Sequence, residues 1–226
     1  MKKLHRTLPS LLVISMLCAT FTSAVTVNAV EENKPEAEEK TVFELPDIVS
    51  EGEAKKYGYV GRVYEDEPNL NTFVFENSDG TNTMRVYSHP VKYYDKDGKI
   101  KDISLKLEKT ENGGFIAPDN DVVTIYEQKL SDGISLSYDD VDVRMIPRTA
   151  KSDMTARLDE KAGSVKYVFD EKTIYEYKPT YMGFKEEIVV SKYTGQTEYD
   201  FSLYTNGLEL CEDDSSFFLK DTARVK

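Results

Sequence analysis

The chain has 226 residues, a formal net charge of −12, 39% hydrophobic residues and 11% aromatic residues. This length and composition suffice for a packed core in one large or two small domains, which disfavours wholesale disorder. The acidic excess disfavours binding to nucleic-acid phosphates or to an anionic membrane, because both need clustered Lys and Arg. One structural zinc site would consume both histidines and both cysteines, which disfavours a zinc scaffold.

Residues 1–29 have the three parts of a secretory signal peptide. A basic start is followed by an apolar stretch at 11–21 and by the tripeptide Val-Asn-Ala at 27–29, with small residues at the positions that signal peptidase reads. The apolar stretch is too short to span a bilayer as a stable helix. We therefore expect secretion, with an uncleaved membrane anchor as the alternative.

Cleavage after residue 29 would make the mature chain more acidic and leave it with few reactive side chains. It leaves 26 Lys and Arg against 41 Asp and Glu, a formal charge of −15, with Cys211 and His89 as the remaining cysteine and histidine. A single cysteine cannot form an intramolecular disulfide, so we expect a fold held by core burial. Alternation around Cys211 predicts a small buried residue, and a catalytic or intermolecular thiol is the alternative.

Next along the chain, residues 30–58 precede the regular pattern. The segment 30–40 is charged, contains a proline and has no apolar periodicity, as expected of an acidic linker. A short helix is predicted within 41–58, weakened by Gly52. From there we expect a first β-rich half at 59–147 and a second at 148–226, with one continuous domain as the alternative. The polar stretch 147–153 is either their boundary or a long loop.

Beyond residue 59, short runs of β-branched and aromatic residues alternate with turn residues, a pattern typical of strands. The predicted strands are 72–75, 84–87, 91–94, 122–126, 134–138, 141–146, 165–169, 174–177, 187–190, 199–204 and 217–219. Glycine-containing turns at 78–80, 96–98, 112–114 and 131–133 supply the positive φ of tight hairpins. No helical pattern is long enough to connect parallel strands. We predict an all-β protein, an antiparallel β-sandwich or two sandwich-like halves.

Catalytic patterns are sparse. The sequence has no Gly-x-Ser-x-Gly motif, and nothing near His89 or Cys211 supports a nucleophilic dyad, so His89 is expected to end a strand before Pro90. A hydrolase with a carboxylate pair stays an alternative. Glu186 and Glu187 are adjacent, but alternation in a strand points them to opposite faces.

Calcium is the one cofactor that the acidic turns suggest. Asp140 and Asp142 lie on one face near a turn, and Asp95-Lys-Asp-Gly98 has the opening of a calcium loop without its later ligands. A hairpin turn already accounts for the Asp-Gly pair, so no metal site is assigned and calcium stays an alternative.

Fifteen tyrosines admit a further interpretation, in which surface rings stack on sugars. The absence of tryptophan weakens it, since that ring is the largest such platform. Tyrosine is also a common half-buried strand residue, and we favour that interpretation for most of them.

Several segments carry a family resemblance. They are Phe73–Thr81, Arg85–Tyr93 and Asp95–Ile103 with Leu105 and Leu107, then Tyr175–Tyr177, Phe184–Val190, Tyr199–Leu203 and Gly207–Leu208. This pattern of turns and strands resembles the N-terminal region of large secreted wall-associated proteins of Gram-positive bacteria, the RHS-repeat and DNRLRE-domain proteins. The resemblance implies a secreted β-rich surface module. Two alternatives stay open: a stand-alone product that keeps the leading module, or a fragment of a longer protein.

Together these observations predict a secreted, non-enzymatic β-sandwich module with a structural or interaction role at the bacterial cell surface. No catalytic residue is assigned. A glycan- or wall-binding module that uses surface tyrosines is the first alternative, and a secreted hydrolase is the second. The expected partner is a wall or surface component or another protein, with no nucleic acid and no transmembrane segment after cleavage.

Overall fold

The structure, a computed structural model, describes residues 51–213 and 217–221. The predicted signal peptide, the acidic linker and the first part of the predicted short helix lie outside the described residues. The rest of that helix is a 3-10 helix, η1 (Glu51–Tyr57). In the described part of the chain, no helix has the length and apolar character needed to cross a membrane.

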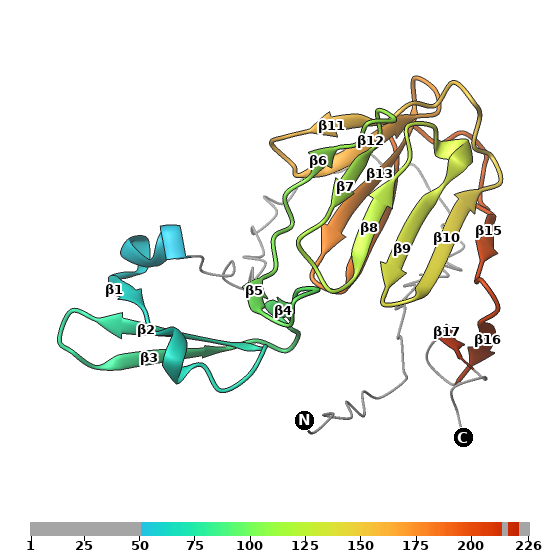
Figure 1. The fold of residues 1–226 in the computed structure, drawn as a ribbon. Helices are drawn as coiled ribbons and strands as arrows, with labels where there is room; N and C mark the ends of the chain where they lie inside the picture. Colours follow the sequence, from blue (N-terminus) through green and yellow to red (C-terminus); the bar gives the residue numbers. More distant parts are fainter. Residues whose placement is uncertain (1–50, 214–216, 222–226) are drawn as a thin grey trace, which may run out of the picture.

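Two antiparallel sheets form a β-sandwich (Figure 1). The six-stranded sheet has the order β15-β10-β9-β8-β7-β6, and the four-stranded sheet has the order β11-β12-β13-β14. The first consists of β6 (Glu108–Lys109), β7 (Phe115–Ala117), β8 (Val123–Tyr126), β9 (Ile134–Tyr138), β10 (Val141–Pro147) and β15 (Phe201–Tyr204). The second consists of β11 (Arg157–Asp159), β12 (Ser164–Val168), β13 (Thr173–Thr180) and β14 (Gly183–Val190). The all-β antiparallel sandwich predicted from the sequence is therefore confirmed.

Three smaller sheets flank the sandwich. A three-stranded sheet precedes it and contains β1 (Tyr59–Arg62), β2 (Thr72–Asn77) and β3 (Asn82–Val86), with the 3-10 turn η2 (Tyr64–Asp66) between β1 and β2. The hairpin of β4 (Lys92–Tyr94) and β5 (Ile100–Asp102) follows it. The hairpin of β16 (Glu209–Glu212) and β17 (Phe217–Lys220) follows β15.

Each of the eleven predicted strand segments contains a strand, and three of the four glycine turns close hairpins, namely β2–β3, β4–β5 and β6–β7. The turn at 131–133 differs, because it belongs to a seven-residue connection that contains the 3-10 turn η3 (Leu130–Asp132). Leu130 is fully buried, and its N–H donates to the carbonyl of Met154 at 2.9 Å. Anchoring in the core thus replaces the tight hairpin there.

Residues on both sides of position 147 share one sheet and one core. β15 pairs with β10 from Pro147↔Phe201 to Arg144↔Tyr204. The N–H of Arg148 also donates to the carbonyl of Asp200 at 2.8 Å. Pro147 ends β10, and residues 148–153 of the polar stretch form a loop between strands of the two sheets.

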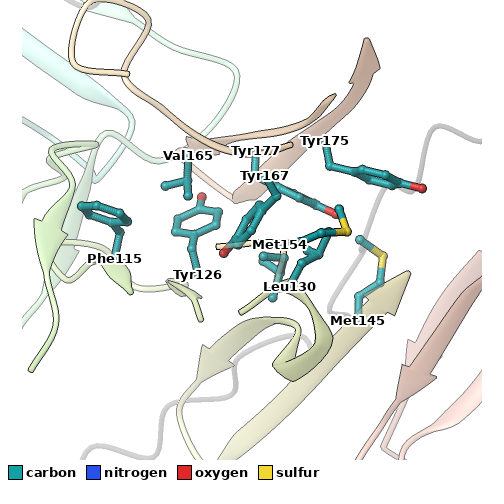
Figure 2. Packing of buried hydrophobic residues seen from close by; sticks show 10 residues of the cluster. Phe115, Tyr126, Leu130, Met145, Met154, Val165, Tyr167, Tyr175 and Tyr177 are labelled. Carbon is teal, nitrogen blue, oxygen red and sulfur yellow. The ribbon is translucent and has the colours of Figure 1, made fainter. Parts of the chain in front are cut away.

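Tyrosine rings occupy much of the space between the sheets (Figure 2). The buried cluster consists of Phe115, Tyr126, Leu130, Ile134, Met145, Met154, Val165, Tyr167, Tyr175 and Tyr177. Alternation along β12 and β13 places Val165, Tyr167, Tyr175 and Tyr177 on the inner face. Tyr167 and Tyr177 pack edge to face with ring centroids 5.9 Å apart, an arrangement that aromatic quadrupoles favour.

Gly114 provides a direct test of the packing between β7 and β8. A Cβ atom at this position would lie 2.3 Å from the carbonyl oxygen of Tyr126 and 2.9 Å from the backbone nitrogen of Gln128. Gly114→Ala is expected to lower the free energy of unfolding by about 2 kcal/mol, because backbone must move to accept the methyl group. Urea unfolding followed by circular dichroism measures the change.

Gly61→Ala is the matched control, since Gly61 also lies in a β-rich region but has no atom within 4 Å of a Cβ. It should unfold within about 0.5 kcal/mol of the parent. Equal effects of the two substitutions would contradict the close approach at Gly114.

Candidate functional site

A buried arginine organises the part of the chain between β1 and β5. The guanidinium of Arg62 lies between two aromatic rings, with its Cζ 3.9 Å from the ring centroid of Phe73 and 4.4 Å from that of Tyr64. None of the Arg62 side chain is exposed. A charged group in such a place needs ionic partners, because removing it from water is expensive.

Two carboxylates and a lysine complete this network. Glu67 accepts two hydrogen bonds from Arg62, Nε to Oε1 at 2.6 Å and Nη2 to Oε2 at 2.9 Å. The Nζ of Lys92 donates to the same Oε2 at 2.6 Å. Asp102 binds the other side of the guanidinium with both oxygens. The side chains of Glu67 and Lys92 are each 3% exposed, whereas that of Asp102 is 44% exposed.

Hydrogen bonds in the network keep Glu67 and Arg62 ionised. Burial raises the pKa of Glu67, but the hydrogen bonds from Arg62 and Lys92 outweigh it, so the pKa lies below its ordinary value. Burial likewise lowers the pKa of Arg62, and the hydrogen bonds to Glu67 and Asp102 outweigh that effect and raise it. Two cations and two anions therefore form a fixed floor whose charges balance.

An open pocket of about 510 Å³ lies over this floor. Its lining comprises Arg62, Tyr64, Glu67, Lys92, Ile100, Lys101 and Asp102. Tyr64 is 53% exposed and Ile100 is 54% exposed, so the pocket presents an aromatic ring and an aliphatic side chain next to its polar groups. An exposed ring next to a carboxylate and an amine is the combination that recognises a sugar, whose faces are apolar and whose rim is hydroxyl-rich.

A second depression, of about 560 Å³, lies over β11, β12 and β13. Its charged side chains pair with one another, as Lys166 does with Asp159 at 2.6 Å, and both of these side chains are about one-third exposed. No aromatic ring lines it. The polar groups of this second depression form an ordinary ion pair on the outer face of the sheet. We therefore favour the pocket lined by Arg62 and Tyr64 as the candidate functional site.

Nine of the fifteen tyrosines are either buried or exposed, and the other six are partly buried. Tyr93, Tyr126, Tyr167, Tyr175 and Tyr177 are buried, which agrees with the strand interpretation for them. Tyr64, Tyr94, Tyr193 and Tyr204 are exposed. Of the exposed set, Tyr64 belongs to the lining of the favoured pocket.

His89 and Cys211 lie on different parts of the fold. His89 is in the loop between β3 and β4, where its ring stacks on Tyr181 at 4.8 Å and its Nδ1 lies 3.1 Å from the carbonyl oxygen of Pro90. Cys211 is in β16, is only partly buried, and pairs across the hairpin with Phe218. Within the described residues these two side chains share no hydrogen bond.

The acidic residues singled out in the sequence do not gather around one point. Glu187 faces outward and accepts from Lys185 at 2.8 Å, while Glu186 faces the core, so the expected opposite faces are confirmed. Asp95 closes the β4–β5 turn by accepting from the N–H groups of Asp97 and Lys99. Among residues 51–213 and 217–221, no group of three or more His, Cys, Asp or Glu side chains is placed to hold a metal ion.

Glu186 is a carboxyl group in an apolar setting. It accepts a hydrogen bond from the hydroxyl of Tyr177 at 2.5 Å. Burial raises the pKa of Glu186 to about 7, against an opposing effect of that hydrogen bond. The protonated acid is therefore present in the folded protein over much of the range below neutrality.

Sequence reasoning did not identify the network residues Arg62, Glu67 and Lys92. Alternation through β4 would leave Lys92 outside, yet Val91, Lys92 and Tyr93 are all buried. The sequence signal that could have indicated burial was the position of Lys92 between Val91 and Tyr93. A lysine in such a position is more often exposed to solvent. The partner of Lys92, Glu67, is 25 positions away, which no local pattern reveals.

Comparisons with family models, curated proteins and solved structures found no match to this chain.

Removing the central carboxylate should destabilise the fold far more than removing the exposed one. Glu67→Ala leaves Arg62 and Lys92 buried without their shared partner, which is expected to lower the free energy of unfolding by about 3 kcal/mol or more. Asp102→Ala, the matched control, removes a partly exposed carboxylate and should cost about 1 kcal/mol or less. Urea unfolding at pH 7 compares them, and equal losses would contradict the central role of Glu67.

The stability of the sandwich should fall as pH rises through weakly acidic values. The pKa of Glu186 is about 7 in the folded protein and near the ordinary 4.5 in the unfolded chain. As pH rises, the unfolded chain therefore loses the proton of Glu186 near pH 4.5, whereas the folded protein keeps it until about pH 7. The stability that this group contributes is full below about pH 4.5 and is lost as pH rises to about 7. Between pH 5 and pH 8 we expect a loss of about 2 kcal/mol from this group.

Glu186→Gln should remove this loss, as measured by urea unfolding at pH 5 and pH 8. Glu187→Gln is the control. The pKa of Glu187 is lowered by its hydrogen bond with Lys185, so its contribution is lost at lower pH and the loss between pH 5 and 8 should persist. A pH dependence unchanged by Glu186→Gln would contradict the assignment.

Proposed function

We propose that the chain is a secreted, non-catalytic β-sandwich module that acts at the bacterial cell surface by binding a wall glycan in the pocket around Tyr64. One observation carries the proposal: an exposed tyrosine ring is held against a buried guanidinium at the wall of an open pocket. The signal-peptide pattern and the resemblance to wall-associated proteins support the location.

The position of Tyr64 suits a stacking platform. Its ring lies on the guanidinium of Arg62, which is itself held by Glu67 and Asp102, so the ring direction is fixed before a ligand arrives. Preorganisation of this kind raises affinity by reducing the conformational entropy lost on binding. A sugar can lie on the outer face of such a ring with its C–H groups in contact.

Polar groups beside the ring match the rim of a sugar. Arg62 orients the carboxylate of Asp102, and the exposed part of that carboxylate can accept hydrogen bonds from hydroxyl groups. Lys101, with its side chain 55% exposed, supplies a donor and is itself paired with Asp95 at 3.2 Å. The lining holds three cations and two anions, and Asp95, the partner of Lys101, balances the third cation, so an uncharged glycan suits the pocket better than a polyanion.

Binding to insoluble Gram-positive cell wall should depend on Tyr64. In a sedimentation assay with increasing amounts of wall, Tyr64→Ala is expected to weaken retention at least about tenfold, which corresponds to about 1.4 kcal/mol. Tyr193→Ala is the matched control, because Tyr193 is 76% exposed but lies outside the pocket. It should bind like the parent.

Three outcomes would reject the proposal. The first is absence of retention, and the second is equal binding by the Tyr64 and Tyr193 variants. The third is release of soluble reducing sugar that Asp102→Asn abolishes, which would favour the hydrolase instead.

Binding to an uncharged glycan should also change less than about twofold between 0.05 and 0.5 M NaCl, since no net charge is neutralised.

A further inference from the structure

The edge strand β3 has its outer backbone groups directed away from the sheet. In the β2–β3 ladder the N–H of Tyr87 donates to Asn71 and the N–H of Asn77 donates to Thr81. With the register Val74↔Met84, the odd-numbered residues of β3 therefore bond to β2. The N–H and C=O groups of Asn82, Met84 and Val86 point to the other side. Figure 1 shows β3 at the outer edge of the three-stranded sheet.

Few features of β3 oppose pairing with another strand. Met84 is 55% exposed and Val86 is 70% exposed, and Asn82, the third outward residue, is uncharged. Arg85 points to the opposite face, where its guanidinium lies 4.9 Å from the ring of Tyr57. Proteins usually protect sheet edges by making them short or charged.

Three of the other edges in the described part of the chain, β6, β11 and β14, have that protection. β6 contains two residues, Glu108 and Lys109. β11 has three residues and ends in charged Arg157 and Asp159. β14 is long but carries Lys185 and two glutamates. β3 has five residues and no charge at its outward positions.

We propose that β3 pairs antiparallel with β3 of a second copy of this chain, with Met84 on the twofold axis. In this register each Met84 faces Met84 of the second copy and each Asn82 faces Val86. All three outward residues of each strand then take part, which gives six hydrogen bonds. The three-stranded sheets join into one six-stranded sheet with an apolar patch of Met84 and Val86 across the axis.

The distribution of charge favours this register and favours a second copy of the chain as the partner of β3. A shift of one register step toward the C-terminus would place Arg85 opposite Arg85 of the second copy, whereas the proposed register places it opposite Thr83. Residues 59–103 contain six Lys and Arg and eight Asp and Glu, so this part of an acidic chain is nearly neutral. Two copies that meet here therefore bring together less like charge than contact through the rest of the chain would. The contact is small, and we expect a dissociation constant in the micromolar range or weaker.

Sedimentation equilibrium of the purified chain tests the association. A monomer–dimer equilibrium is expected, and Met84→Lys should raise the dissociation constant at least tenfold because it places two ammonium groups opposite each other. Val60→Lys is the control, since Val60 is 57% exposed on β1, away from the outer side of β3. It should associate like the parent. A monomer at all concentrations up to about 1 mM, or a dimer insensitive to Met84→Lys, would overturn the proposal.

Cross-linking tests the register. In a Cys211→Ser background, Met84→Cys places two thiols about 5.5 Å apart by Cα, and a short homobifunctional maleimide should join them rapidly. Val86→Cys places its thiols about 14 Å apart, because each lies four residues from the twofold partner position. It should cross-link at least tenfold more slowly. Equal rates, or faster cross-linking of the Val86 variant, would reject the twofold axis at Met84.

Discussion

The two sheets of the sandwich meet over tyrosine rings, and each ring brings a hydroxyl group into a region that excludes water. The positions of three of these rings are therefore limited by where their hydroxyls can form a hydrogen bond. Tyr167 donates to the carbonyl of Glu127 at 2.6 Å, Tyr175 bonds Thr149 at 2.7 Å, and Tyr177 bonds Glu186. The first two bonds tie β12 and β13 to connections of the opposite sheet and so help to fix how the layers sit against each other, whereas the third joins β13 to β14 within one sheet.

The sequence was a good guide to strands whose own residues favour them. Segments such as 72–75 and 165–169 are rich in β-branched and aromatic residues, and their turns contain glycine, so local preference and tertiary structure agree. Short strands such as β6 and β11 were not predicted, because Glu108–Lys109 and Arg157–Asp159 are extended only through pairing with neighbours. The burial of Leu130 was also hidden, since the contact with Met154 joins distant segments.

The pocket could not be predicted from the sequence either, because its residues come together from distant positions in the chain. Surface tyrosines were considered as sugar platforms, but composition alone could not separate Tyr64 from the buried tyrosines. What distinguishes it is Arg62, whose guanidinium is placed by Phe73, Glu67 and Asp102 together. The ion pairs among Arg62, Glu67, Lys92 and Asp102 hold these side chains in place, and their two positive and two negative charges cancel. The same network thus links the stability of residues 59–103 to any ligand bound above it.

The tyrosine core also determines how this protein responds to strong base. Burial raises the pKa of Tyr126, Tyr167, Tyr175 and Tyr177, because a phenolate is disfavoured where water is absent. In the unfolded chain the same groups ionise near pH 10. As pH rises past that value, the unfolded state releases protons that the folded state retains, and folding becomes less favourable. Alkali should therefore denature the sandwich cooperatively, and the phenolate absorbance of the buried rings should appear only as the two sheets separate.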